Sequence, residues 1–330
     1  MLRLPVLITA ILAIAPAALA QAAPSDPFAL SPTSLAPMTE IPRTPDGKPD
    51  FQGVVWATNY FPVFELSPMS ADLVVPEDEA RRIVDTIFAG MAGFLEKSID
   101  PEAHVIMGET DGLPIVRGER RTRLIVVPAN GKLPLTDQAR QLAKDTETMD
   151  GEKDNYEQRP SSERCLVVSG VPPIHAVISY NRQRIIQTPT HVVIHNENGD
   201  EARIIPFAET FDAPGPTSWY GDSIARWEGD TLVIKTTRTP EIERVRGLMT
   251  KFVMNPDAVI TERYTRLSTD ELLYQFTIED PWAYSEPWIA EFSFKAATTG
   301  MFPSPCHEHN YSLPNILRGQ RVADAEAAAN

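Results

Sequence analysis

The stretch LLYQFTIE, residues 272–279, alternates apolar and polar side chains with a period of two. The stretch WIAEFSFK, residues 288–295, repeats the same alternation. In both, one set of alternate residues is largely aromatic or aliphatic, which is typical of an antiparallel strand with one face on a hydrophobic core. These two stretches decide the fold class that we expect for the chain.

Further strand–turn–strand patterns precede these two stretches. They cover residues 185–194, where Pro189 predicts an edge or a bulge, and then 202–207, 224–227, 231–237 and 260–267. About six to eight strands at such short spacing predict a barrel or a sandwich. We therefore expect a mainly β protein, an antiparallel β-barrel of the calycin or lipocalin type.

Helical patterns come before the strands. Acidic residues follow Pro76, and apolar residues recur at helical spacing as far as Phe94, which predicts a helix ending near Lys97. A second helix is expected from Thr136 to about Thr148.

The chain is expected to divide into two main regions. Residues 49–160 would form a mixed α/β region packed on the barrel. Residues 161–330 would form the antiparallel β domain with a short C-terminal helix.

The first twenty residues are typical of a secretory signal peptide. Arg3 precedes an apolar run, and residues 18–20, Ala-Leu-Ala, give the small-x-small cleavage pattern. Residues 21–48 are rich in Pro, Ala and Ser, which predicts an extended, poorly ordered leader. We therefore expect a periplasmic or secreted protein without a membrane anchor.

The net charge of the chain disfavours some classes of binding partner. Asp and Glu number 45 against 30 Lys and Arg, a formal net charge of -15. Such a chain is repelled by phosphate backbones and by anionic lipid surfaces, so nucleic acids and membrane surfaces are disfavoured as partners. A small-molecule substrate or ligand is the partner that we expect.

The chain has two cysteines, Cys165 and Cys306. In an oxidising compartment a single pair of cysteines favours a disulfide. The alternative is a catalytic thiol at Cys306 beside His307.

Several phrases distributed along the chain resemble an uncharacterised family of exported proteins from Gram-negative bacteria. They are TPDGKPD (44–50), ERCL (163–166), QTP (187–189), ARIIP (202–206), GDS (221–223), WEGDTLV (227–233) and CHExNY (306–311). The resemblance implies export but no particular chemistry. Where this family tends to have His-Glu-x-x-His-Asp-Ala-Arg, the chain has Asn196 and Asp200 in place of the two histidines.

A metal site is therefore a weaker interpretation, and we expect no metal and no cofactor. A metal site would need His307 and His309 together with His191 and His195, whose imidazoles suit zinc or copper. The loss of the two histidines of the resembled family argues against it.

The densest polar cluster is CHEHNY, residues 306–311. We predict that His307 and Glu308 are catalytic, because an imidazole beside a carboxylate can transfer protons near neutral pH. Asp222 is expected to assist them. The alternative is a structural role, in which these polar side chains cap the final helix.

A second group of side chains is predicted to bind the substrate. It comprises Arg203, Glu197, Tyr180, Trp219 and Tyr311. Aromatic side chains beside a carboxylate suit a sugar or an aromatic ring. For Arg203 and Glu197, an ion pair across the turn at 198–199 is the structural alternative.

These residues together predict a cofactor-independent enzyme, a lyase, isomerase or hydrolase that acts on a small aromatic or glycoside. A lipocalin-like carrier without turnover is the alternative, and a structural envelope component is the third possibility. An enzyme needs a titratable group that faces a cavity, whereas a carrier does not. The surroundings of His307 and Glu308 therefore separate the first two.

Overall fold

The described part of the chain begins after the predicted signal peptide. The computed structural model describes residues 41–329 except 59, 61–63, 66–68, 98–111, 152, 168–170, 175–181, 212–217, 242–243, 247–251 and 309. These residues belong to one compact unit. The predicted signal peptide and most of the predicted leader lie outside the described residues.

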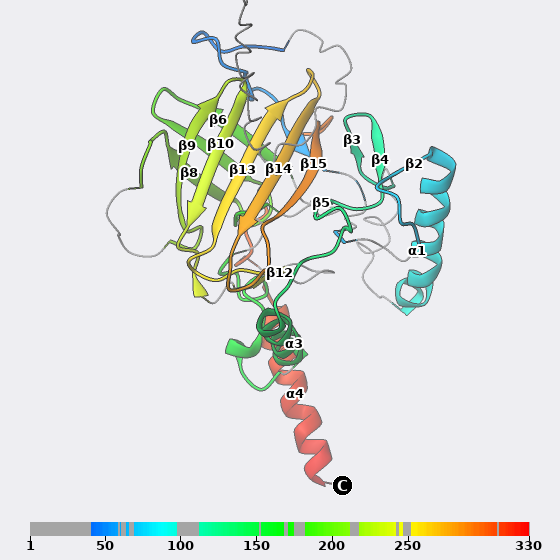
Figure 1. Ribbon diagram of the computed structural model, residues 1–330. Coiled ribbons are helices and arrows are strands. Elements are labelled where there is room, and N and C mark those ends of the chain that lie inside the picture. The colour runs from blue at the N-terminus through cyan, green and yellow to red at the C-terminus, as the bar shows by residue number, and fades with distance from the viewer. Residues whose placement is uncertain are drawn as a thin grey trace, which may run out of the picture. The chain divides into compact units, whose positions relative to one another are not determined.

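One large antiparallel sheet dominates the described residues (Figure 1). Its strands are β1 (Trp56–Ala57), β5 (Ile125–Val127), β6 (Arg182–Gln187), β7 (His191–Asn196), β8 (Glu201–Pro206), β9 (Asp222–Glu228), β10 (Thr231–Thr237), β13 (Val259–Arg266), β14 (Glu271–Glu279) and β15 (Trp288–Ala296). They lie in the order β8-β7-β6-β1-β15-β14-β13-β10-β9, and β5 also pairs with β15. Since β1 and β5 come from the predicted mixed α/β region, strands of both predicted regions share one sheet.

The sheet curls until its two outermost strands meet. Phe207 and Ala225 form a parallel β-bridge beside β8 and β9, and the Ala208 N–H donates to the Ala225 carbonyl at 3.1 Å. No continuous ladder joins β8 to β9 in the described residues. The mainly β, antiparallel fold is confirmed, whereas a closed calycin-like barrel is not.

The alternation in β14 and β15 produces the aromatic inner face of the sheet. Tyr274 lies opposite Phe292, and Phe276 lies opposite Ala290. The ring centroids of Tyr274 and Phe292 are 5.0 Å apart, a distance typical of packed aromatic pairs. Because all four side chains are buried in one hydrophobic cluster, the inside of the curled sheet is a packed core.

A buried ion pair crosses this core. The guanidinium of Arg203 on β8 donates to both carboxylate oxygens of Glu262 on β13, at 3.1 and 2.7 Å. Both side chains are at most 1% exposed. Burial alone would lower the pKa of Arg203, but the charge and hydrogen bonds of Glu262 outweigh burial and the pKa is raised. Arg203 therefore remains charged inside the core.

Neighbouring hydroxyl groups complete the surroundings of this pair. Tyr274 donates to Glu262 Oε1 at 2.8 Å, and Arg203 Nη2 donates to Thr236 Oγ1 at 3.4 Å. Burial raises the pKa of Tyr274 well above its usual value, so its hydroxyl stays a donor. Such partners are what a buried charge requires, because an unpaired one costs several kcal/mol.

Smaller elements surround the large sheet. The strands β2 (Val74–Val75), β3 (Ile115–Val116) and β4 (Glu119–Arg121) form a second sheet, and β11 (Val245–Arg246) pairs with β12 (Phe252–Val253). The helices are α1 (Glu77–Lys97), α3 (Asp137–Gly151) and α4 (Ser312–Ala329), with a 3-10 turn at Tyr156–Gln158. Both predicted N-terminal helices are confirmed, and α4, with 18 residues, is longer than the short helix expected.

The segment around Pro189 is a turn, which corrects the expected edge or bulge. The Thr188 N–H donates to the His191 carbonyl at 2.9 Å, and β6 pairs with β7 from Gln187 opposite Val192. Pro189 has no backbone N–H to contribute to a ladder, so the chain reverses there.

The described end of the predicted leader, residues 41–48, lies against the sheet. Arg43 forms an antiparallel bridge with Pro49 and donates to both carboxylate oxygens of Asp230, at 2.9 and 2.7 Å. This part of the leader, expected to be extended, is a turn attached to the β9–β10 connection.

We predict that Arg203→Met destabilises the protein by about 3–5 kcal/mol, because it leaves the charge of Glu262 buried without its partner. The double variant Arg203→Met/Glu262→Leu removes both charges and should recover most of this loss. Urea unfolding measures each free energy of unfolding.

Arg43→Met, which removes an exposed ion pair, is the control and should leave the unfolding midpoint unchanged. Equal losses in the single and double variants would contradict a charge-based role for the buried pair.

Candidate functional site

The predicted catalytic residues His307 and Glu308 lie on the segment between β15 and α4. Both side chains are exposed. A proton-transfer pair works best where its geometry is fixed and its surroundings shift its pKa toward the working pH. The exposure of these two side chains adds no support for an acid/base role, which stays a prediction.

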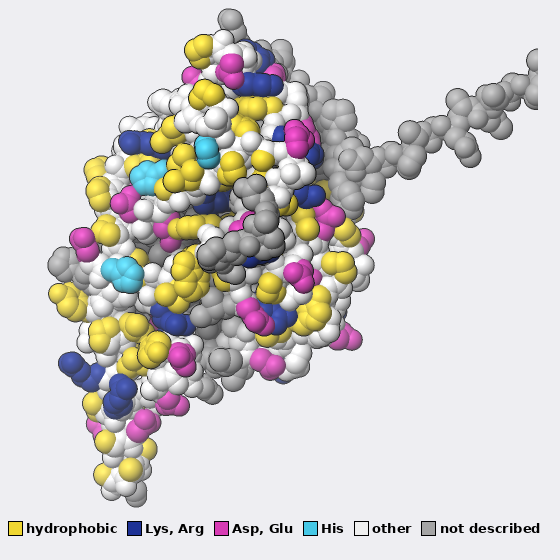
Figure 2. All heavy atoms as spheres, turned by 90° about the vertical axis from the view of Figure 1, so that its left-hand side faces the viewer, with side chains coloured by type: hydrophobic (Ala, Val, Ile, Leu, Met, Phe, Trp, Pro, Cys, Tyr) yellow, Lys and Arg dark blue, Asp and Glu magenta, His cyan; other side chains and the backbone are white. Residues whose placement is uncertain are grey.

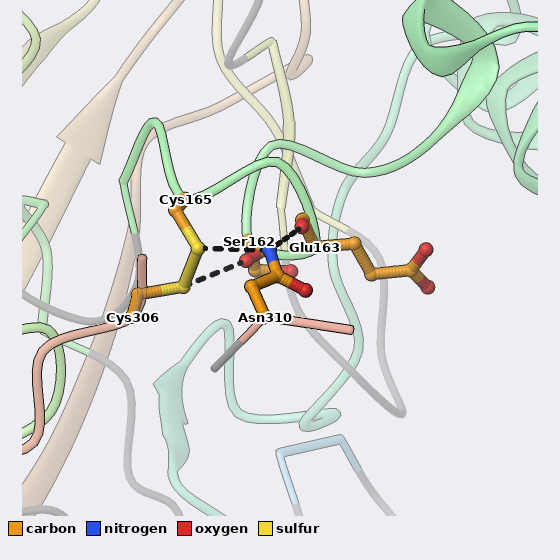
Figure 3. The surroundings of a disulfide bond; sticks show 5 residues. All are labelled: Ser162, Glu163, Cys165, Cys306 and Asn310. Atoms are coloured by element: carbon orange, nitrogen blue, oxygen red, sulfur yellow. Dashed lines mark hydrogen bonds between the residues drawn. A yellow bond between two sulfur atoms is a disulfide. The ribbon is translucent and has the colours of Figure 1, made fainter. Parts of the chain in front are cut away.

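The predicted disulfide between Cys165 and Cys306 is present, with Cα atoms 5.5 Å apart. Figure 3 shows its surroundings: Cys306 Sγ lies 3.5 Å from the Ser162 carbonyl oxygen, and Asn310 Nδ2 donates to the Glu163 carbonyl at 2.9 Å. The bond ties the segment before α4 to the loop before β6. A free catalytic thiol at Cys306 is therefore excluded in this structure.

Glu197 has a structural role beside the β7–β8 turn. Its carboxylate is 2% exposed and accepts from Arg182 Nη1 at 3.0 Å and from the Phe302 N–H at 2.8 Å. The expected ion pair between Glu197 and Arg203 is wrong, because Arg203 points into the core and binds Glu262. Both predicted binding residues are buried against protein partners.

Asp222, predicted to assist catalysis, stands at the start of β9. Its carboxylate pairs with Arg238 Nη1 at 2.6 Å. The adjacent Ser223 lies inside the sheet, where Arg203 Nη2 approaches its hydroxyl at 3.4 Å. Burial raises the pKa of the nearby Tyr220 to about 12, so its hydroxyl is protonated at neutral pH. Ser223 at the start of β9 thus lies near Arg203, whereas the carboxylate of Asp222 is paired with Arg238.

The predicted aromatic binding residues are on the surface or outside the described residues. Trp219 precedes β9 and is 41% exposed, and Tyr311 precedes α4 and is 65% exposed. Tyr180 lies outside the described residues.

The histidines proposed for the metal alternative have other partners. His195 Nε2 lies 2.8 Å from Asp200 Oδ1, and His191 Nδ1 lies 2.9 Å from Thr190 Oγ1. Histidine side chains lie on one face of the molecule among hydrophobic ones (Figure 2). His309 is outside the described residues, which contain no group of three His, Cys, Asp or Glu side chains that could hold a metal ion.

A groove of about 480 Å³ lies on the outer face of β9, β10 and β13. Residues 208–211, which follow β8 and lie against the edge of β9, line one side of it. Phe211, Ile224 and Val233 give the lining its apolar part. Val233 is 3% exposed and lies opposite Arg226 and Arg263 on the neighbouring strands, so it forms the floor.

Charged side chains surround this floor. Glu228 accepts from Arg226 Nε at 3.0 Å and from Arg263 Nη1 at 2.6 Å. The hydrogen bonds from Arg263 and then from Arg226 lower the pKa of Glu228, which keeps it ionised. Lys235 also lines the groove and is exposed, without a carboxylate within ion-pair distance among the described residues. Glu209 supplies a further negative charge that acts on Arg226.

The residues of this groove were not found by the sequence analysis. Alternation in the predicted strands places Arg226, Lys235 and Arg263 on the outer face, and that is the one signal present in the sequence. Outward charges on a strand are common, however, and only the register of three strands gathers these around Val233.

Comparison with protein-family models, with curated proteins and with solved structures found no match to this chain. The resemblance to exported Gram-negative proteins therefore stays a prediction. In the described residues, no helix has the length and apolar character needed to cross a membrane.

We predict that removing the disulfide lowers the free energy of unfolding by about 4–5 kcal/mol, because it joins residues 141 positions apart and restricts the unfolded chain. Urea unfolding of Cys165→Ser/Cys306→Ser against the wild type measures the loss. The wild type in reductant should match the double variant. An unchanged midpoint would show that the bond contributes no stability.

Proposed function

We propose that this chain binds a small organic molecule in the groove on β9, β10 and β13, without converting it. The observation that carries the proposal is the groove. Its volume of about 480 Å³ falls within the range of roughly 300–1,000 Å³ that is typical of small-molecule sites. An apolar floor with a few polar groups around it is also the usual composition of such sites.

The residues that line the groove favour binding over acid/base catalysis. Neither His307 nor Glu308 is among them, and the described part of the lining contains no histidine. The arginines Arg226 and Arg263 are held by Glu228, so they supply positive charge and no base. The described lining thus offers charged recognition groups, such as Lys235 and Glu209, without the predicted pair of His307 and Glu308.

This proposal takes up the carrier, which the sequence analysis held as the alternative to an enzyme, but it changes the location of the ligand. A lipocalin-like barrel holds its ligand inside. Here the ring of Tyr274 packs within about 6 Å of neighbouring rings, including Phe276 at 5.7 Å and Phe292 at 5.0 Å, inside the curled sheet. The ligand is therefore proposed to lie on the outer face, with the curled sheet as its support.

We also propose that the protein works outside the cytoplasm. The basic start and apolar run of residues 1–20 are typical of a secretory signal, and disulfides such as Cys165–Cys306 persist in oxidising compartments. A net charge of -15 favours a small ligand over a nucleic acid.

We predict that N-phenyl-1-naphthylamine, a neutral fluorescent probe, binds the protein saturably with one site per chain. Thr261 lines the groove, so Thr261→Trp should fill it and weaken probe binding at least tenfold in a fluorescence titration. Thr277→Trp is the matched control, because Thr277 lies opposite Thr261 on β14 and does not line the groove. Its affinity should stay within about twofold of the wild type.

Circular dichroism verifies that both variants are folded. Absence of saturable binding, or equal binding by all three proteins, would overturn the proposed function.

A further inference from the structure

Lys235 differs from the other two cations of the groove. It lies on the outer face of β10, between Ile224 on β9 and Thr261 on β13. Glu228 holds both Arg226 and Arg263, whereas Lys235 is exposed and forms no ion pair within the described residues. Its ammonium group is therefore available to an anionic group of a ligand.

The charged residues of the groove also favour an anionic ligand. Three cations line it, and two carboxylates, Glu209 and Glu228, lie with them. Among the described residues, these three cations thus outnumber the two carboxylates by one, on a chain whose net charge is -15. One negative charge on a ligand would neutralise this excess, whereas a neutral ligand would leave it and a dianion would reverse it.

The apolar part of the groove lies beside the free cation. Val233 precedes Lys235 by two residues, so both side chains are on the same face of β10, about 7 Å apart along the strand. Phe211 and Ile224 extend the apolar surface. A ligand that satisfies both parts carries an acid group at one end of an apolar body, as an arylacetic acid does.

We propose that the ligand of this groove is a small organic monoanion, an aromatic or aliphatic carboxylic acid, whose carboxylate binds the Nζ of Lys235 while its apolar body lies against Phe211 and Ile224. This inference rests on the proposed function, since it names the class of molecule that the same groove takes. A carboxylate accepts charge-assisted hydrogen bonds from an ammonium group, and these are stronger than neutral ones. Inorganic anions lack the apolar body and should bind weakly.

The test compares a carboxylate ligand with its neutral amide, which has nearly the same shape. Displacement of N-phenyl-1-naphthylamine is titrated with 1-naphthaleneacetate and with its neutral amide, 1-naphthaleneacetamide. In the wild type the acid should bind about tenfold more tightly than the amide, the effect of one charged hydrogen bond in a partly enclosed site.

Variants of Lys235 assign that difference to one side chain. Lys235→Met should weaken the acid about tenfold and leave the amide unchanged, and Lys235→Arg should retain the preference for the acid. Lys132→Met, which removes an exposed lysine that does not line the groove, is the control and should behave like the wild type.

The two proposals fail in different ways. If the neutral probe binds and Thr261→Trp abolishes its binding, but acid and amide bind equally in the wild type and in Lys235→Met, the groove binds ligands and the monoanion inference is overturned. If the neutral probe does not bind saturably, the proposed function itself is overturned.

Discussion

The arrangement of the sheet depends on the buried ion pair between Arg203 and Glu262. Placing two charges inside an aromatic core costs several kcal/mol unless each has partners. Here the guanidinium binds both carboxylate oxygens, and Tyr274 and Thr236 provide hydroxyl groups beside them. No continuous ladder joins β8 to β9 in the described residues. The ion pair therefore helps to connect the two ends of the sheet from inside, as the ladder between the first and last strands does in a closed barrel. Because Arg203 is on the edge strand β8 and Glu262 is on β13, the ion pair connects these two strands across the core.

The groove depends on the position of β8 beside β9. Residues 208–211 continue from β8 and meet β9 through the hydrogen bond from Ala208 to Ala225. They become one side of the groove only because β8 is held near β9. The floor and the cations come from β9, β10 and β13, whose register is fixed by antiparallel pairing. The ion pair inside the sheet and the hydrogen bond from Ala208 thus both hold the strand that leads into one side of the groove.

Much of the fold could be predicted from local sequence. The alternation in 272–279 and 288–295 predicts β14 and β15, and the two cysteines predict the disulfide, because each signal is carried by neighbouring residues or by residue type. The partner of Arg203 could not be predicted in this way. Glu262 is 59 positions away, whereas Glu197 is close in the sequence but lies beside the β7–β8 turn, where it binds the Phe302 N–H.

The candidate site was harder to predict for the same reason. His307 and Glu308 attract attention because they are adjacent in the sequence, yet adjacency does not enclose them. Arg226, Lys235 and Arg263 each resemble an ordinary solvated charge on a strand. Their significance depends on the side-by-side register of three strands, which alternation within a single strand does not contain.

Hydrogen–deuterium exchange across the wild type and Arg203→Met/Glu262→Leu tests most directly whether the buried pair builds the groove. The account predicts that amides of β8 and of residues 208–211 exchange faster in the double variant, while β14 and β15 keep their protection. Binding of N-phenyl-1-naphthylamine should weaken in parallel. Unchanged protection of β8 and residues 208–211, with probe binding retained, would contradict the account, because the groove would then be held in place without the ion pair.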